Sequence, residues 1–184
     1  MAGDRAALIS LLKQRSVRFG DFTLASGARS PYYIDCRLTT MSGAGQRLIG
    51  PLGLQAIHDA GWSPDAIGGL TMGADPVAYA IAAASANTPA PLDAFSVRKE
   101  AKKHGTGRRI EGNFKPGDRV VVIEDVITSG GSAITAISAV REEGGEVIGL
   151  LALVDREAGG REAIEACGVA VRSLVAASEL GIGG

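Results

Sequence analysis

The chain has 184 residues, 46% of them hydrophobic, so it can bury one continuous core and a single domain is expected. Its 19 basic and 20 acidic side chains nearly cancel, which leaves no overall field strong enough to hold a polyanion such as duplex DNA. It has no secretion signal and no apolar run of about eighteen residues, and Cys36 and Cys167 stand far apart, so we expect a cytoplasmic protein with free thiols and neither a nucleic-acid nor a membrane partner.

The N-terminal part of the chain is expected to form a small cap. Between Asp4 and Gln14, apolar residues recur at spacings of three and four, which predicts a short amphipathic helix. The next segment, residues 17–37, holds half of the aromatic residues among glycine, serine and proline, and it predicts short strands and loops. We expect residues 1–40 to form the cap of one domain that spans residues 1–184.

From residue 43 onward, strand and helix patterns alternate. This alternation predicts an α/β fold, with right-handed crossovers and a mainly parallel central sheet that is flanked by helices. Sheets of this kind bind ligands beyond the carboxyl ends of their strands. The predicted strands are residues 66–70, 92–97, 119–124, 147–154 and 169–175, and the predicted helices are residues 43–60, 76–86, 131–143 and 160–167.

One of these strands leads through two acids into a loop of small residues. The β-branched run from Val120 to Ile123 predicts a strand buried on both faces, and Glu124 and Asp125 follow it. In the loop at 128–132, backbone N–H groups, hydroxyls and the positive end of the next helix would converge on a phosphate dianion. The alternative is an ordinary helix start, in which hydroxyl side chains satisfy the end amides.

The acid pair favours the phosphate site. Two charges at the end of a central strand are costly unless they meet water, a metal or ligand hydroxyls. Successive strand side chains point to opposite faces, so we expect only one of the two acids to face a sugar. With a phosphate in the loop, that carboxylate could accept hydrogen bonds from the hydroxyls of a ribose 5-phosphate. The Walker and dinucleotide-binding glycine patterns are missing, which argues against those two classes.

Two basic features complete the candidate site. Residues 98–113 carry the densest positive charge and three glycines, which favours a mobile basic loop, although a charge run alone also describes a solvated surface. Arg156 follows the strand that ends at Val154, and its guanidinium could pair bidentately with a ligand carboxylate. The alternative is that Asp155 caps the next helix and Arg156 lies on the surface.

Three separate strings resemble the orotate phosphoribosyltransferases of the type I phosphoribosyltransferase family. They are VVIEDVITSGGS at 121–132, DFTLASGARSPYYID at 21–35 and VRKEAKKHGTG at 97–107, and they occur in the family's order. The resemblance implies a glycosyltransferase that moves the ribose 5-phosphate of phosphoribosyl diphosphate onto orotate. The products would be orotidine 5′-monophosphate and diphosphate, as in pyrimidine (UMP) biosynthesis.

The resemblance also implies roles for individual residues. Phosphoribosyl diphosphate would be bound by Glu124, Asp125, Val126, Ile127, Thr128, Ser129, Gly130, Gly131 and Ser132, and orotate by Thr128 and Arg156. The catalytic residues would be Asp125 together with Arg98, Lys99, Lys102 and His104, whose positive charge would stabilise the departing diphosphate. Mg²⁺ would be bound mainly through the diphosphate and the ribose hydroxyls, with no dedicated protein ligands. The family works as a homodimer in which the basic loop is shared between subunits.

The chain departs from the family pattern at two positions. Many members carry lysines where this sequence has Ala25 and Gly73, so two positive contacts are missing. Two rival functions also stay open. A sister enzyme acting on a purine or another pyrimidine is disfavoured by Arg156. A non-catalytic sensor that binds RNA or a protein is disfavoured by the complete acid pair and the basic loop.

Overall fold

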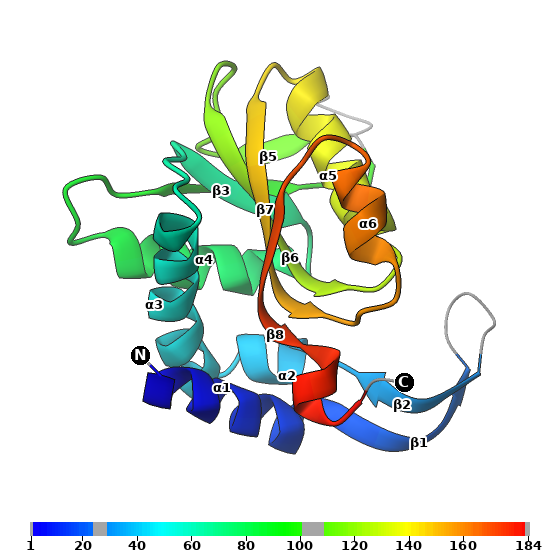
Figure 1. The fold of residues 1–184 in the computed structure, drawn as a ribbon. Helices are drawn as coiled ribbons and strands as arrows, with labels where there is room; N and C mark the ends of the chain where they lie inside the picture. Colours follow the sequence, from blue (N-terminus) through cyan, green and yellow to red (C-terminus); the bar gives the residue numbers. More distant parts are fainter. Residues whose placement is uncertain (1, 24–28, 101–108, 183–184) are drawn as a thin grey trace.

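A six-stranded sheet forms the centre of the computed structural model, which describes residues 2–23, 29–100 and 109–182 (Figure 1). The strand order is β5-β4-β3-β6-β7-β8, and all neighbours are parallel except β4 and β5. This confirms the predicted α/β class. The strands are β3 (Ala66–Leu70), β4 (Asp93–Val97), β5 (Ile110–Gly112), β6 (Arg119–Ile127), β7 (Glu146–Asp155) and β8 (Val171–Ala176).

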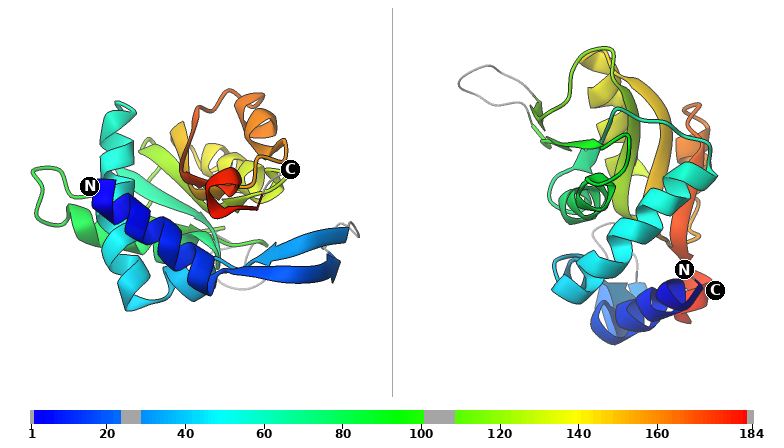
Figure 2. Two further views of the ribbon diagram at one scale, coloured as in Figure 1. Left: turned by 60° about the horizontal axis from the view of Figure 1, so that its bottom comes forward. Right: turned by 90° about the vertical axis from the view of Figure 1, so that its left-hand side faces the viewer.

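Helices cover both faces of this sheet (Figures 1 and 2). On one face lie α3 (Gly43–Asp59) and α4 (Ala74–Ser85), and on the other lie α5 (Gly131–Glu142) and α6 (Gly160–Glu165). The predicted helices and most predicted strands match these elements to within a residue or two. None of the helices that the structure describes has the length and apolar character needed to cross a bilayer.

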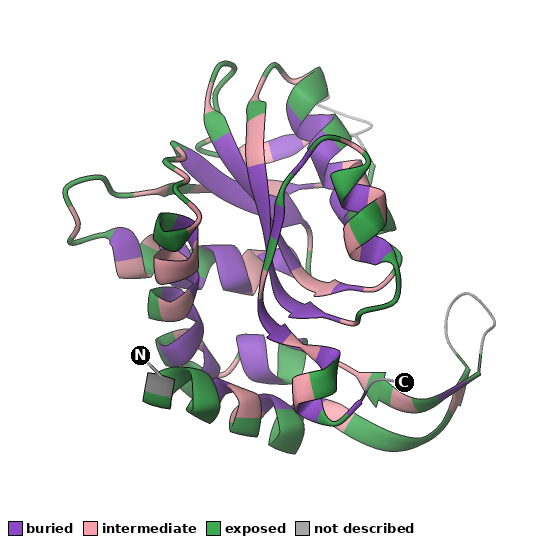
Figure 3. Cartoon of the chain, in the orientation of Figure 1, coloured by how far each residue is buried: buried purple, intermediate pink, exposed green. Residues whose placement is uncertain are grey.

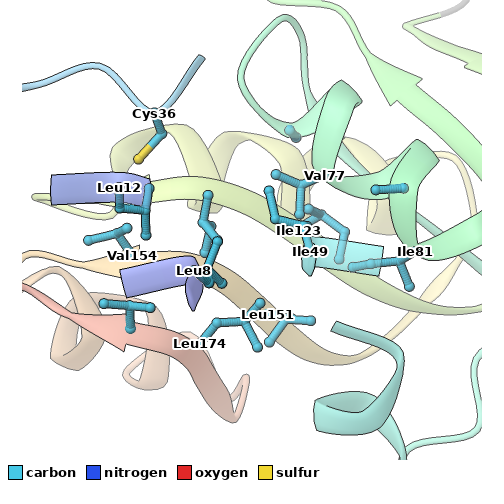
Figure 4. Packing of buried hydrophobic residues seen from close by; sticks show 14 of the residues in the cluster. Leu8, Leu12, Cys36, Ile49, Val77, Ile81, Ile123, Leu151, Val154 and Leu174 are labelled. Carbon is cyan, nitrogen blue, oxygen red and sulfur yellow. The ribbon is translucent and has the colours of Figure 1, made fainter. Parts of the chain in front are cut away.

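The central strand β6 contributes to the core on both of its faces. Val121 and Ile123 pack into the cluster formed with α3 and α4, part of which Figure 4 shows. Val120 and Val122 pack into the cluster formed with α5 and α6. All four side chains are fully buried, and the middle of the sheet is buried throughout (Figure 3). The β-branched run therefore has the double-sided burial that the sequence predicts.

The N-terminal part of the chain consists of α1 (Ala2–Arg15), a two-stranded ribbon of β1 (Val17–Thr23) and β2 (Arg29–Ile34), and α2 (Arg37–Thr40). Leu8 and Leu12 of α1 are fully buried in the same cluster as α3 and α4. Arg5 donates from Nε to the Leu174 carbonyl of β8 at 3.1 Å. The part predicted as a cap thus shares a continuous core with the rest of the molecule.

The structure differs from the sequence prediction in three ways, two of which arise from pairing between distant segments. Strand β6 continues to Ile127, beyond the predicted end at 124, because Val126 and Ile127 pair with Val154 and Asp155 of β7. Strand β5 lies in the segment predicted as a loop and pairs antiparallel with β4. The short helix α2 and the 3-10 helix η1 (Ala177–Leu180) were not anticipated by any periodic pattern.

Candidate active site

A cavity of about 1020 Å³ opens at the carboxyl edge of the parallel strands. Its walls come from residues 33–37, which include the end of β2, from 70–73, which begin at the last residue of β3, from 98–100 after β4, from part of the segment 124–132, and from Arg156 after β7. The segments that follow β3, β4, β6 and β7 meet because the carboxyl ends of these parallel strands share one edge of the sheet, whereas residues 33–37 come from the separate β1–β2 ribbon. The acid pair, the small-residue loop, the start of the basic segment and Arg156 therefore line one space, as the sequence predicts.

The acid pair combines a buried and a more accessible carboxylate. Glu124 is only 5% exposed, whereas Asp125 is half-buried, and both line the cavity. The Asp125 N–H donates to Glu124 Oε1 at 3.1 Å, and the Val126 N–H donates to Asp125 Oδ1 at 2.9 Å. Burial, followed by the contact with Asp125, raises the pKa of Glu124 well above its usual value. Asp125 is consequently the more accessible of the two acids to a ligand in the cavity.

The loop after β6 leads directly into helix α5. Gly130 adopts a left-handed conformation (φ 81°) directly before α5, and no side chain caps this helix. The capped helix start that the sequence left open is therefore wrong. Thr128, Ser129 and Ser132 line the cavity. Among the other residues assigned to the phosphate site, the side chain of Ile127 is fully buried in the core.

The loop is held close to the start of α6. A Cβ atom at Gly160 would lie 2.4 Å from the Thr128 carbonyl oxygen and 2.8 Å from the Gly130 nitrogen. Only glycine lets the two backbones approach in this way. The position of the loop is thus set by a residue about thirty positions further along the chain.

The turn after β3 explains one departure from the family pattern. A Cβ atom at Gly73 would lie 2.5 Å from Asp125 Oδ1 and 2.7 Å from its Cγ. Any larger side chain would have to displace the Asp125 carboxylate. The space that a side chain would need at position 73 is therefore occupied by the Asp125 carboxylate, which lies against the backbone of the turn.

Asp75 fastens this turn to the end of β4. Its Oδ2 accepts a hydrogen bond from Thr71 Oγ1 at 2.6 Å, and its Oδ1 accepts one from Ser96 Oγ at 2.7 Å. Ser96 Oγ also lies 2.8 Å from the Tyr79 hydroxyl. This network fixes the point from which the basic segment leaves the sheet.

Two of the predicted catalytic cations lie in the described part of the chain, and both line the cavity. Arg98 and Lys99 follow β4 directly. The Arg98 backbone N–H donates to the Arg109 carbonyl at 2.9 Å, and the Arg98 side chain donates from Nε to Glu111 Oε1 at 3.1 Å. These bonds hold the start of the basic segment against β5. Lys102, His104 and Ala25 lie outside the described residues.

Arg156 is oriented into the cavity. Its backbone N–H donates to the Ile127 carbonyl at 2.9 Å, which links the ends of β6 and β7. Its guanidinium carbon lies 4.8 Å from the centroid of the Tyr32 ring, and its Nε is buried with no hydrogen-bond partner. Because Arg156 lines the cavity, the surface alternative for this residue is wrong.

The proposed capping role of Asp155 is wrong as well. Asp155 is 4% exposed and accepts hydrogen bonds from Arg161 Nε and the Glu157 N–H, both at 2.9 Å. Helix α6 begins after Gly159 and has no side-chain cap. Asp155 thus forms an ion pair with Arg161 of α6 and not with Arg156.

Asp35 and Arg37 form a charged pair at the cavity that was not predicted from the sequence. Arg37 donates from Nε to Asp35 Oδ1 at 2.8 Å and from Nη2 to Asp35 Oδ2 at 2.9 Å. The hydrogen bond to Arg37 is the main cause that lowers the pKa of Asp35. Both residues line the cavity. The signal in the sequence was that Asp35 ends the 21–35 string and Arg37 follows two residues later.

The described residues do not form a metal site made of protein side chains alone. Within residues 2–23, 29–100 and 109–182, no group of three or more His, Cys, Asp and Glu side chains is arranged to hold an ion. Glu124 and Asp125 are the acids at the centre of the cavity, and one of them is largely buried. This donor set suits a cation that brings most of its ligands with it.

Comparison with known proteins identifies the family. The family model for the phosphoribosyl transferase domain matches residues 44–178. The orotate phosphoribosyltransferase of Aquifex aeolicus is 49% identical over 180 residues, with 96% of this chain and 97% of the relative covered. The enzyme of Mycobacterium tuberculosis is 48% identical over 183 residues, with 99% of each covered.

Solved structures agree with this result. The crystal structure of the M. tuberculosis orotate phosphoribosyltransferase with Fe(III) dicitrate has a TM-score of 0.86 at 46% identity and covers 97% of this chain and 99% of its own. The complex of that enzyme with 5-phospho-α-D-ribosyl 1-diphosphate has a TM-score of 0.82 at 42% identity, with 97% and 99% covered. An adenine phosphoribosyltransferase from Leishmania donovani, 19% identical, shares the fold with a TM-score of 0.65 and covers 94% of this chain and 81% of its own. The chain belongs to the orotate phosphoribosyltransferases of the phosphoribosyltransferase family.

Proposed function

We propose that this chain transfers the ribose 5-phosphate of phosphoribosyl diphosphate to orotate, giving orotidine 5′-monophosphate and diphosphate. The observation that carries the proposal is that the small-residue loop, the acid pair, two cations and Arg156 meet in one cavity. The phosphoribosyl diphosphate complex of the M. tuberculosis relative supports it.

The loop at 128–132 is proposed to hold the 5-phosphate. Backbone N–H groups of Ser129 to Ser132, the hydroxyls of Thr128, Ser129 and Ser132, and the positive end of α5 would all favour the dianion. Glu124 and Asp125 would accept hydrogen bonds from the ribose hydroxyls. Val126 and Ile127, the last residues of β6, would place the acids and the loop at the correct spacing.

The reaction is a substitution at the anomeric carbon. The bond from this carbon to the diphosphate oxygen breaks, a bond to a ring nitrogen of orotate forms, and the proton that this nitrogen carried passes to the departing diphosphate or to water. Negative charge develops on the leaving oxygen, where we place Arg98, Lys99, Lys102 and His104. Positive charge develops on the sugar, where the Asp125 side chain would stabilise it. A basic loop that closes over the site would also exclude the water that competes for the sugar.

Mg²⁺ is the proposed cofactor. When bound, it would neutralise charge on the diphosphate and so favour its departure. The two adjacent acids fit an ion that is bound mainly through the diphosphate and the ribose hydroxyls. Asp125 would accept hydrogen bonds from those hydroxyls.

Orotate is proposed to lie between Thr128 and Arg156. A carboxylate offers the bidentate acceptor that a guanidinium prefers, and the Nε of Arg156 is buried without a partner. That unsatisfied donor supports a ligand carboxylate at this place, because buried polar groups are rarely left without an acceptor.

The assembly and location complete the proposal. We propose a homodimer that shares the basic loop between its two active sites, and a cytoplasmic location. The free thiols of Cys36 and Cys167 fit a reducing compartment. Neither nucleic acid nor a membrane is a proposed partner.

A substrate assay tests the function. Purified protein with Mg²⁺ and phosphoribosyl diphosphate should consume orotate and release diphosphate, and it should leave uracil and adenine unchanged. Uracil differs from orotate only by the carboxylate that Arg156 would bind. Turnover of uracil at the rate of orotate would overturn the orotate assignment, and turnover of adenine would favour the sister enzyme.

A further inference from the structure

We propose that Tyr32 is a positioning residue that holds the Arg156 guanidinium ready for the substrate carboxylate. The guanidinium carbon lies 4.8 Å from the centroid of the Tyr32 ring, within the range of a cation–π contact. Tyr32 is half-buried and does not line the cavity, whereas Arg156 does. Tyr32 would thus act through Arg156, and the inference rests on the proposed role of that arginine.

The backbone fixes the Tyr32 ring in its place. Tyr32 lies opposite Phe19 in the antiparallel β1–β2 ribbon. The hydroxyl of Ser30, which is 6% exposed, donates to the Tyr32 carbonyl at 2.7 Å. The Tyr32 side chain also packs against the cluster formed by α1, α3 and α4. The ring is therefore packed between the ribbon and the core, beside Arg156.

A ring face orients an arginine differently from a carboxylate. Arg161 is held by Asp155, and Arg37 is held by Asp35, so a carboxylate of the protein already accepts N–H groups of each of these arginines. In the described part of the chain, no ion pair is found for Arg156, and its Nε has no acceptor. An aromatic face attracts the cation without accepting its in-plane N–H groups, which stay available for a ligand carboxylate.

This arrangement predicts an effect on orotate alone. Without the ring, the guanidinium would sample more orientations, and ordering it again on binding would weaken the affinity for a carboxylate substrate. The phosphate loop and the basic residues do not touch Tyr32 through any hydrogen bond in the described ranges. The affinity for phosphoribosyl diphosphate should therefore stay near its original value.

The first experiment compares Tyr32→Leu with Tyr32→Phe, which keeps the aromatic face. We expect Tyr32→Leu to raise the KM for orotate about tenfold and Tyr32→Phe to leave it within about twofold of the original protein. Phe19→Leu is the matched control, because it removes an exposed ring from the opposite strand of the same ribbon. If Tyr32→Leu does not fold, Tyr32→Met fills the space without a ring and carries the same expectation.

The second experiment is a double-mutant cycle with Arg156→Ala. If Tyr32 acts through Arg156, Tyr32→Leu should change the KM for orotate little once Arg156 is absent. A full additional loss in the double variant would overturn the positioning role, as would an unchanged KM in Tyr32→Leu alone. If instead Arg156→Ala itself left the KM for orotate unchanged, the proposed orotate site would fail, which is a distinct result.

Discussion

Glu124 is placed in the active-site cavity at a cost to the folded protein. Only 5% of it is exposed, it touches a second carboxylate, and both effects raise its pKa. A carboxyl group in this position binds a proton more readily in the folded chain than in the unfolded one. Ionising it therefore destabilises the free protein until a ligand with hydroxyl donors arrives.

The substitution Glu124→Gln tests this account. Because the folded pKa is raised above the ordinary value of 4.5, the wild-type protein loses stability as the pH rises from 4.5 through that folded pKa. Glutamine does not ionise, so the variant should melt about 2–4 °C higher than wild type at pH 8, with the difference vanishing near pH 4. Thermal unfolding at several pH values measures this. A variant that is less stable at pH 8 would show that the ionised carboxylate is a net stabiliser.

Arg156 carries the choice of substrate in our account. Arg156→Ala should raise the KM for orotate by the equivalent of about 2–3 kcal/mol, because a charged and buried contact is lost. The KM for phosphoribosyl diphosphate should change little. Steady-state kinetics with each substrate varied in turn measures the difference. Arg172→Ala, at an exposed arginine of β8, is the control. Equal effects on both substrates would remove Arg156 from the orotate site.

The residues of the site differ in how far the sequence could reveal them. The acid pair and the loop at 128–132 are contiguous, so one strand and its turn bring them together. The contact between Tyr32 and Arg156 joins residues more than a hundred positions apart and depends on side-chain orientation. The 21–35 string matched the family, but the role of each ring in it required the three-dimensional packing.

At the scale of elements, the active site depends on how the loop after β6 meets α6. The Thr128 carbonyl and the Gly130 nitrogen lie so close to Gly160 that a Cβ atom there would overlap both. The backbone, and not a flexible side chain, would have to move. The phosphate loop is thus shaped by its neighbour as well as by its own glycines.

We therefore expect Gly160→Ala to damage the phosphate site. The added methyl group should cost about 1–3 kcal/mol of stability and should raise the KM for phosphoribosyl diphosphate, since the loop must shift. Gly43→Ala, at a helix start where a Cβ atom meets nothing within 4 Å, is the matched control. Unfolding by denaturant and steady-state kinetics measure both effects. An unchanged KM would mean that the loop adapts without losing its ligand geometry.

Elements that follow a periodic pattern were predicted well, and elements defined by long-range pairing were not. The spacing of apolar residues predicts strands β3, β4 and β7 and the helices between them. The extension of β6 to Ile127 depends on its partner β7, and β5 exists because Ile110 to Gly112 pair with β4. Basic and polar residues dominate that segment, so its sequence resembles a loop.

At the scale of the whole molecule, the cavity lies where a parallel sheet presents all its carboxyl ends. That place was predictable from the alternation of strands and helices. The contribution of residues 33–37 was not, because it depends on how the β1–β2 ribbon and α2 dock beside the sheet. The N-terminal part thereby supplies one wall of the site.

The proposed shared loop makes a prediction about mixed dimers. Lys102→Ala and Asp125→Asn should each inactivate the enzyme when present in both subunits. After mixing and subunit exchange, half of the dimers contain one of each, and these have one intact site if the loop crosses to the partner. Activity should then recover to about a quarter of the original. A mixture that stays inactive, although size-exclusion and mass measurements show mixed dimers, would mean that each loop serves its own subunit.

The most direct measurement is a crystal structure of the protein with ribose 5-phosphate. We expect the phosphate to accept hydrogen bonds from the backbone and hydroxyl groups of residues 128–132, with the ribose hydroxyls on Asp125. A sugar phosphate bound elsewhere, with this loop empty in a saturated crystal, would contradict the account.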